Sequence, residues 1–159
     1  MNKKKKLNRA IDDLSFAIMH LSQGIKFEIQ KKTTNNFEKM KEDYEKTNIL
    51  KVSAVGSEKS IYKNKYINIL ARVYHDKIHL EYNKDFSKYD EIIVARIQYA
   101  EVKNFLKSHI SLNRARHAAM LLHIDIHDQV LYYDKNNEFV KNQYKFVKER
   151  FYKYLDEVI

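Results

Sequence analysis

The sequence predicts a single, mainly α-helical domain: a bundle of five to six helices with one short β element, expected near 48–55 or 77–83. The 159 residues include no proline and only two glycines, too few for the many tight turns of an all-β domain. Apolar residues recur at helical spacing through most of the chain, and at 44% they can fill one packed core. The length fits one domain over 1–159, with residues 1–6 expected to form a disordered basic tail.

Local patterns place the individual helices. The clearest stripe covers residues 7–29, where leucine and isoleucine recur at alternating steps of four and three. Further helices are expected at 35–47 with Asn35 as cap, and at 60–74 with Ser57 or Ser60 as cap. In the second half, helices are expected at about 90–108 with Asp90 as cap, from Ser111 onward with that residue as cap, and at about 137–157 after a turn at 134–137. The loop-like stretch 48–57 has the character of a short strand, and so does the alternation around Ile78, Leu80 and Tyr82.

The charge balance indicates the class of partner. Thirty basic and 21 acidic residues give a net charge of +9, which is typical of a protein that meets phosphate groups. The alternative is a solubility charge in a chain with a general bias toward lysine. Because the basic residues also gather in Lys3–Arg9 and in a stripe near the C-terminus, nucleic acid is the expected partner.

The absence of cysteine and the lack of long apolar runs indicate where in the cell the protein is expected. The chain has no cysteine, which excludes disulfide frameworks, thiolate zinc sites and cysteine nucleophiles. No apolar run approaches the roughly 20 residues that span a bilayer. The basic start resembles the charged part of a signal peptide, but Arg9, Asp12 and Asp13 interrupt any apolar segment behind it. The sequence predicts a cytoplasmic protein without membrane contact.

The densest polar cluster lies in the predicted helix that follows Ser111. Arg116 and His123 are seven residues apart, so on a helix they share one face, opposite the apolar stripe. An arginine can hold a phosphate by two hydrogen bonds, and a histidine can take a proton from a ribose 2′-hydroxyl or give one to the leaving oxygen. This chemistry needs no metal and no cofactor, and none is expected. The alternative is a solvated helix face.

Arg116, His117 and His123 spell R-(N/D/H)-x5-H, which resembles the R-x4–6-H signature of HEPN domains. The resemblance covers residues 7–30, which look like the first long helix of that family, and 111–131. It implies a small helical bundle, often a metal-independent endoribonuclease of toxin–antitoxin, CRISPR-associated or phage-defence systems, active as a homodimer and held in check by a cognate antitoxin or inhibitor. By position, Arg116 would bind the scissile phosphate, His123 would be the acid or base, and His117 would orient them.

Other readings of the histidines remain open. Arg72 and His79 form a second R-x6-H match, with Val73 in the usual polar place. The segment that ends in His123 is similar to part of the HD-type metal phosphohydrolases, but an isoleucine separates it from the aspartate, and the adjacent pair at 127–128 lacks remote ligands. A metal site from His123, Asp125 and His127 would need a strand, or would use the two histidines alone on a helix. No Walker A, G-x-G-x-x-G, HExxH or G-x-S-x-G motif occurs.

A basic stripe near the C-terminus is a second candidate surface. The residues assigned to nucleic-acid binding are Lys141, Lys145, Lys148, Tyr152 and, from the earlier cluster, Arg114. Lysines one helical turn apart suit backbone phosphates, and tyrosine rings can stack on bases. This favours an alternative function, that of a non-enzymatic nucleic-acid-binding or regulatory protein of a phage, plasmid or mobile element. An interaction protein with incidental charge is the third hypothesis.

Overall fold

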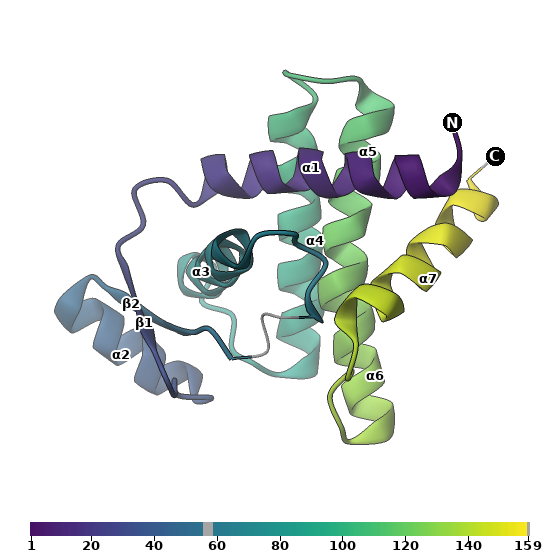
Figure 1. Ribbon diagram of the computed structural model, residues 1–159. Helices are drawn as coiled ribbons and strands as arrows, with labels where there is room; N and C mark the ends of the chain where they lie inside the picture. The colour runs from purple at the N-terminus through teal and green to yellow at the C-terminus, as the bar shows by residue number, and fades with distance from the viewer. Residues whose placement is uncertain (56–58, 159) are drawn as a thin grey trace.

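The computed structural model describes residues 1–55 and 59–158 (Figure 1), and within them it is mainly helical. The elements are α1 (Lys3–Leu21), β1 (Phe27–Gln30), α2 (Phe37–Thr47), β2 (Leu50–Ser53), α3 (Lys65–Glu81), α4 (Lys88–Leu106), α5 (Leu112–His123), the π-helical segment η2 (Ile124–Asp128), α6 (Gln129–Asn136) and α7 (Gln143–Glu157). Because α5, η2 and α6 run on without a break, the described residues form six continuous helices. The predicted fold class is confirmed.

The main core lies where α1 crosses α4 and α5 (Figure 1). Ala115, Ala118 and Ala119 of α5 are fully buried, and their small side chains let the neighbouring helices approach closely. Larger buried side chains such as Leu14 and Phe151 fill the space between the helices. Burying each such side chain contributes about 1.5–3 kcal/mol, so this layer supplies much of the stability. At the far end, α7 returns to the start of α1.

A smaller core joins the β element to α3. The two strands are parallel, with Phe27 opposite Leu50 and Gln30 opposite Ser53, and α2 is the crossover that parallel pairing requires. The buried side chains shared by this unit are Phe37, Met40, Leu50, Val52, Ile69 and Val73. Helix α3 therefore packs on the main core with one face and on this small core with another.

Asparagine residues begin and end several helices of this chain, which has no proline and only two glycines. Asn36 and Asn64 cap α2 and α3, each accepting a hydrogen bond from a backbone N–H in the first turn. Asn48, Asn83 and Asn137 take positive φ angles of 55°, 51° and 53° and end or follow helices. This explains how a chain with so few glycines turns between helices.

Parts of the first half differ from the sequence predictions. The helix predicted for 7–29 ends at Leu21, and residues 27–30 pair as β1 after a turn in which Gly24 takes φ +79°. The basic tail is ordered from Lys3, which begins α1. A strand near 48–55 is confirmed as β2, but none forms at 77–83, where α3 continues to Glu81. The alternation there arises because Ile78 faces the main core while Leu80 faces the small one.

The remaining boundaries differ by a few residues. Helix α3 begins after Asn64, Ser60 bonds locally to Tyr62 instead of capping it, and Ser57 lies outside the described residues. Ser87 caps α4 in place of Asp90, and Ser111 caps α5 as predicted. The turn expected at 134–137 comes later, since α6 extends to Asn136 and α7 begins at Gln143.

No helix in the described ranges has the length and apolarity to span a bilayer.

Candidate metal centre

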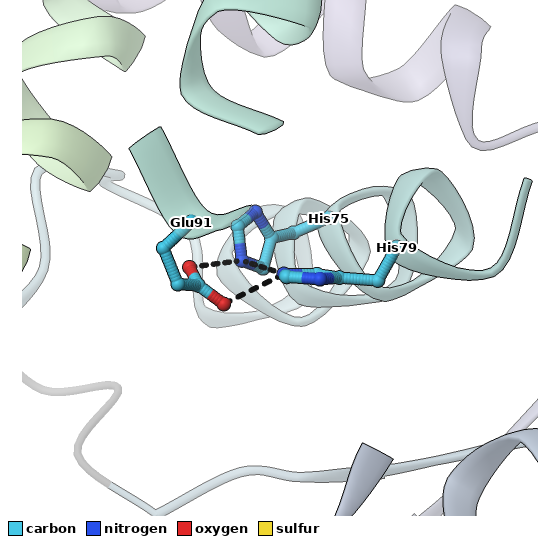
Figure 2. Close-up of side chains that lie close together, drawn as sticks. All are labelled: His75, His79 and Glu91. Carbon is cyan, nitrogen blue, oxygen red and sulfur yellow. Dashed lines mark hydrogen bonds and ion pairs between the residues drawn. The ribbon is translucent and has the colours of Figure 1, made fainter. Parts of the chain in front are cut away.

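Two histidines and a glutamate from neighbouring helices converge on one point. His75 and His79 lie one turn apart on α3, and Glu91 lies in the first turn of α4. Figure 2 shows the three side chains directed toward one another. His79 Nε2 lies 2.7 Å from Glu91 Oε1, His75 Nε2 lies 3.2 Å from Glu91 Oε2, and the two Nε2 atoms are 3.1 Å apart. Within residues 1–55 and 59–158, no other group of three such ligands is close enough to share a metal ion.

These distances suit a small divalent cation. Ligand atoms about 2.0–2.1 Å from a tetrahedral zinc lie roughly 3.3 Å from one another. The Nε2–Nε2 and Nε2–Oε2 separations of 3.1 and 3.2 Å are already close to that value. The third separation, 2.7 Å between His79 Nε2 and Glu91 Oε1, is a hydrogen-bond distance and would have to open by roughly 0.6 Å around a metal ion.

The outer nitrogens of both rings are already engaged. His79 Nδ1–H donates to the backbone carbonyl of Lys84 at 2.8 Å, and a carbonyl can only accept, so this nitrogen carries the proton. His75 Nδ1 lies 2.7 Å from Oε1 of the fully buried Gln98. Such outer partners hold the ring tautomer of metal-binding histidines and direct the Nε2 lone pair inward. The cluster therefore has the outer hydrogen bonds that metal sites need as well as the ligands.

The inner atoms require a positive charge among them. Two imidazole nitrogens and a carboxylate facing one another are all acceptors unless a proton or a metal ion lies between them. Burial lowers the pKa of His75, but the hydrogen bond and charge of Glu91 outweigh it and raise this pKa to about 9. Burial raises the pKa of Glu91, and its hydrogen bonds to both histidines outweigh that and lower it to about 2. In the metal-free protein a proton on the histidine pair supplies this positive charge.

Solvent reaches the cluster at His75 and Glu91 but not at His79. The His79 side chain is fully buried; the Phe86 ring is T-shaped to its ring at 5.0 Å, and the tilted Phe37 ring lies further away, at 6.5 Å. The side chains of His75 and Glu91 are 23% and 15% exposed. A metal held here would keep a side open to water or substrate, as catalytic zinc sites do.

Asp76 adds a carboxylate beside the ligands. It makes no hydrogen bond and no ion pair with any described residue. Burial raises its pKa, although the nearby histidines act in the opposite direction. Its side chain lines a cavity of about 420 Å³, which Phe86 also lines. A half-buried carboxylate without a partner, facing a cavity next to a ligand cluster, is typical of a proton-transferring group.

A second acid lies behind the cluster. Asp125 of η2 accepts a hydrogen bond from Gln129 Nε2 at 2.6 Å, and burial raises its pKa to about 6, against the opposing charges of His75 and Arg72. The Arg72 guanidinium donates to the carbonyls of Ser53 and Val55, which ties α3 to the end of β2. The second R-x6-H match thus places its histidine in the candidate metal centre and its arginine against the backbone.

The predicted catalytic residues on α5 do not contact one another. Arg116 is exposed, and His117 is buried with its ring edge-on to Phe151 and Tyr154. Burial, followed by the charges of Lys6 and Arg9, lowers the pKa of His117. In the described ranges, no hydrogen bond or ring contact joins Arg116, His117 and His123. The His117 side chain therefore faces the core, whereas the Arg116 side chain lies on the protein surface.

The segment 123–128 is helical, so the proposed strand that would align three metal ligands does not form. His123 stacks on His127 with ring centroids 4.8 Å apart, while Asp125 turns toward Gln129. His127 Nδ1 lies 2.8 Å from Asp128 Oδ1. The three-ligand prediction for His123, Asp125 and His127 was wrong, and only the helical pair of histidines remains.

The predicted nucleic-acid contacts are divided between the surface and an internal ion pair. Lys145, Lys148 and Tyr152 lie on α7, with the Lys148 ammonium 5.8 Å from the centre of the Tyr152 ring, whereas Lys141 precedes the helix. Arg114 is paired within the chain: its Nη2 lies 2.7 Å and its Nε 3.1 Å from the two carboxylate oxygens of the buried Asp13, while its side chain is 35% exposed. Two of its guanidinium nitrogens are therefore already engaged.

Part of the metal centre had a signal in the sequence. Residues 75–79 read His-Asp-Lys-Ile-His, which is HExxH with aspartate in place of glutamate. A search that allowed this exchange would have found both histidines and Asp76, but not Glu91. Comparison with protein-family models, curated proteins and solved structures finds no significant match to this chain.

Proposed function

We propose that this protein is a divalent-metal-dependent hydrolase whose metal is held by His75 Nε2, His79 Nε2 and the Glu91 carboxylate. The observation that carries the proposal is the convergence of these atoms while the outer ring nitrogens are held by Lys84 and Gln98. Two histidines and a glutamate are a ligand set of catalytic zinc sites, which leave the fourth position to water. Zinc is the metal this set favours, with manganese and iron as competitors.

Asp76 would act as the proton carrier. A metal of this kind lowers the pKa of its bound water to about 7, which makes hydroxide available near neutral pH. In HExxH sites the glutamate after the first histidine is the general base, and we assign the same role to Asp76, which would take a proton from the attacking water. The water oxygen forms a bond to the electrophilic atom of the substrate, the leaving-group bond breaks, and Asp76 returns the proton to the leaving group.

A metal titration of the purified protein tests the proposal. Protein stripped with a chelator is titrated with zinc, and bound metal is counted by elemental analysis after dialysis. We expect one equivalent in the wild type and none in the variants His79→Gln and Glu91→Gln. Circular dichroism shows whether each variant keeps its helices.

The matched control is the other histidine pair with one-turn spacing. His123→Gln combined with His127→Gln removes two stacked histidines from a helix without touching the three ligands. This variant should still bind one equivalent of zinc. Absence of binding in the wild type, or equal loss in this control, would refute the metal centre.

A second candidate is the predicted HEPN-like endoribonuclease centred on Arg116 and His123. It is supported by the exposed Arg116, by His123 two turns further along the same helical run, and by the neighbouring His127, which Asp128 holds in place. The π-helical segment that begins directly after His123 is a feature frequent at functional sites. Its reaction would need no metal and would leave a 2′,3′-cyclic phosphate. RNA, a second copy of the chain and a cognate inhibitor in a defence or toxin–antitoxin system would be its partners.

Chelation separates the two candidates. RNA cleavage that survives EDTA and disappears in His123→Ala favours the ribonuclease, whereas hydrolysis that EDTA abolishes favours the metal centre. Nucleic-acid binding with a steep salt dependence and no cleavage would instead favour the non-enzymatic role, with the lysines of α7 as contacts.

A further inference from the structure

A cavity next to the metal centre indicates which substrate it takes. The cavity measures about 420 Å³ and is walled by the segment after β1, by α2, β2 and α3 and by Phe86. We call it the lysine groove because Lys32, Lys39 and Lys51 line it. The exposed side chains of Lys32, Thr33, Thr34 and Lys39 on its wall show that it opens to solvent, so a substrate larger than the cavity could lie across it.

The groove leads to the candidate metal ligands. Asp76, which follows the ligand His75 in the chain, forms part of its wall. Phe86 forms another part, and the centre of its ring lies 5.0 Å from that of the ligand His79. The ligands His75, His79 and Glu91 do not line the cavity themselves, so a molecule seated in the groove would approach the metal centre beside Asp76 and Phe86.

The charges that line the groove favour an anion. Lys51 is paired with Asp43 at 3.3 Å, so these two groove residues neutralise each other. The ammonium groups of Lys32 and Lys39 make no ion pair or hydrogen bond with any described residue, and both side chains are exposed. With a divalent cation bound, four formal positive charges would face the two negative charges of Asp76 and Glu91. The net field attracts an anionic group.

The polar groups of the groove suit phosphate in particular. Thr33 and Thr34 add hydroxyl groups between the two free lysines, next to the start of α2, where Asn36 caps the helix. A phosphate offers several oxygens that can accept from ammonium and hydroxyl donors together, and the positive end of a helix adds to the attraction. Resting on the proposed hydrolase function, we infer that the substrate is a phosphate ester, with its phosphate held by Lys32 and Lys39.

The reaction is then hydrolysis of a phosphorus–oxygen bond. The water oxygen bonds to phosphorus, the ester oxygen leaves, and the proton taken by Asp76 passes to that oxygen. No oxidant, reductant or further reactant is needed.

Binding of inorganic phosphate at low salt, measured by calorimetry with and without zinc, tests the inference. The variant Lys32→Gln/Lys39→Gln should weaken phosphate binding by about tenfold or more, because two charge-assisted contacts are lost. The control Lys107→Gln/Lys135→Gln removes the same charge from two exposed lysines, one directly after α4 and one on α6, and should change phosphate binding by less than about twofold. Hydrolysis of bis(4-nitrophenyl) phosphate by the zinc-loaded protein should fall with the first variant alone.

The outcomes distinguish this inference from the proposed function. If the wild type binds zinc but not phosphate, or if both double variants lose phosphate equally, the groove is not a phosphate site while the metal centre stands. If zinc does not bind at all, the metal titration refutes the hydrolase by itself. Phosphate binding that depends on Lys32 and Lys39 in the metal-free protein would still support the groove as an anion site.

Discussion

Oε1 of Glu91 lies 2.7 Å from Nε2 of His79, although the two residues stand on different helices twelve positions apart. The turn between α3 and α4 produces this approach. The Lys84 N–H donates to the carbonyl of His79 at 2.9 Å, and the His79 ring donates back to the Lys84 carbonyl at 2.8 Å. One residue of the turn thus holds both the backbone and the ring of His79, and α4 starts where its first turn can present Glu91 to that ring.

Asp76→Asn should separate proton transfer from metal binding. The amide keeps the size of the side chain but cannot accept a proton at neutral pH, so hydrolysis by the zinc-loaded protein should fall by about 10²–10⁴-fold. The variant should still bind one equivalent of zinc, since Asp76 is not one of the three ligands. Turnover and metal content are measured on the same preparation. A variant that keeps wild-type turnover would remove Asp76 from the mechanism.

Gln98→Leu should weaken metal binding, while in the metal-free protein the lost hydrogen bond to His75 and the removal of an unsatisfied amide act on stability in opposite directions. Leucine is of similar size, but it cannot accept the hydrogen bond from His75 Nδ1, and losing such an outer partner typically lowers affinity by about 10–100-fold. The side chain is fully buried and its Nε2 has no partner in the described structure, so leucine also removes an unsatisfied amide. Competition with a coloured chelator gives the zinc affinity, and thermal unfolding gives the stability. Unchanged affinity would show that Gln98 does not hold the ring.

Arg114→Ala should act on stability rather than on nucleic-acid binding. The substitution leaves the Asp13 carboxylate, only 10% exposed, without its two hydrogen bonds. We expect the free energy of unfolding to fall by about 1–3 kcal/mol in urea denaturation. Affinity for single-stranded RNA should change no more than in Lys135→Ala, an exposed lysine. A selective loss of RNA affinity in Arg114→Ala would restore this arginine as a contact.

His117 should make stability depend on pH. Burial, and then the charges of Lys6 and Arg9, lower its pKa below the ordinary 6.5, so the unfolded chain takes up the proton at a higher pH than the folded one. The stability that neutral His117 allows is therefore present above pH 6.5 and is lost as the pH falls through the lowered pKa. His117→Leu should be less sensitive to acid than the wild type in denaturant titrations at several pH values.

The control for that titration is His109→Leu, because His109 is an exposed histidine at the end of α4. It should leave the acid sensitivity of the wild type in place. If His117→Leu and the wild type lose stability in parallel as the pH falls, protonation of His117 is not the cause.

Most helices could be predicted because their signals act over a few residues. The apolar stripe at 90–108 and the cap Ser111 correspond closely to α4 and to the start of α5. The errors lie where packing outweighs the local pattern. Ile29 continues the helical spacing of α1, yet residues 27–30 pair with β2, and α3 imitates a strand because it lies between two cores.

Local sequence was thus enough for a mainly helical chain, the cap Ser111 and the positive charge. These properties depend on residue type and on spacing within a single helix. Glu91, the outer partners Lys84 and Gln98, and the lysine groove beside Asp76 came together only when α3, α4 and the small parallel sheet packed against one another. Spacing along the chain does not record such contacts, because the turns and the shared cores set which side chains meet across helices.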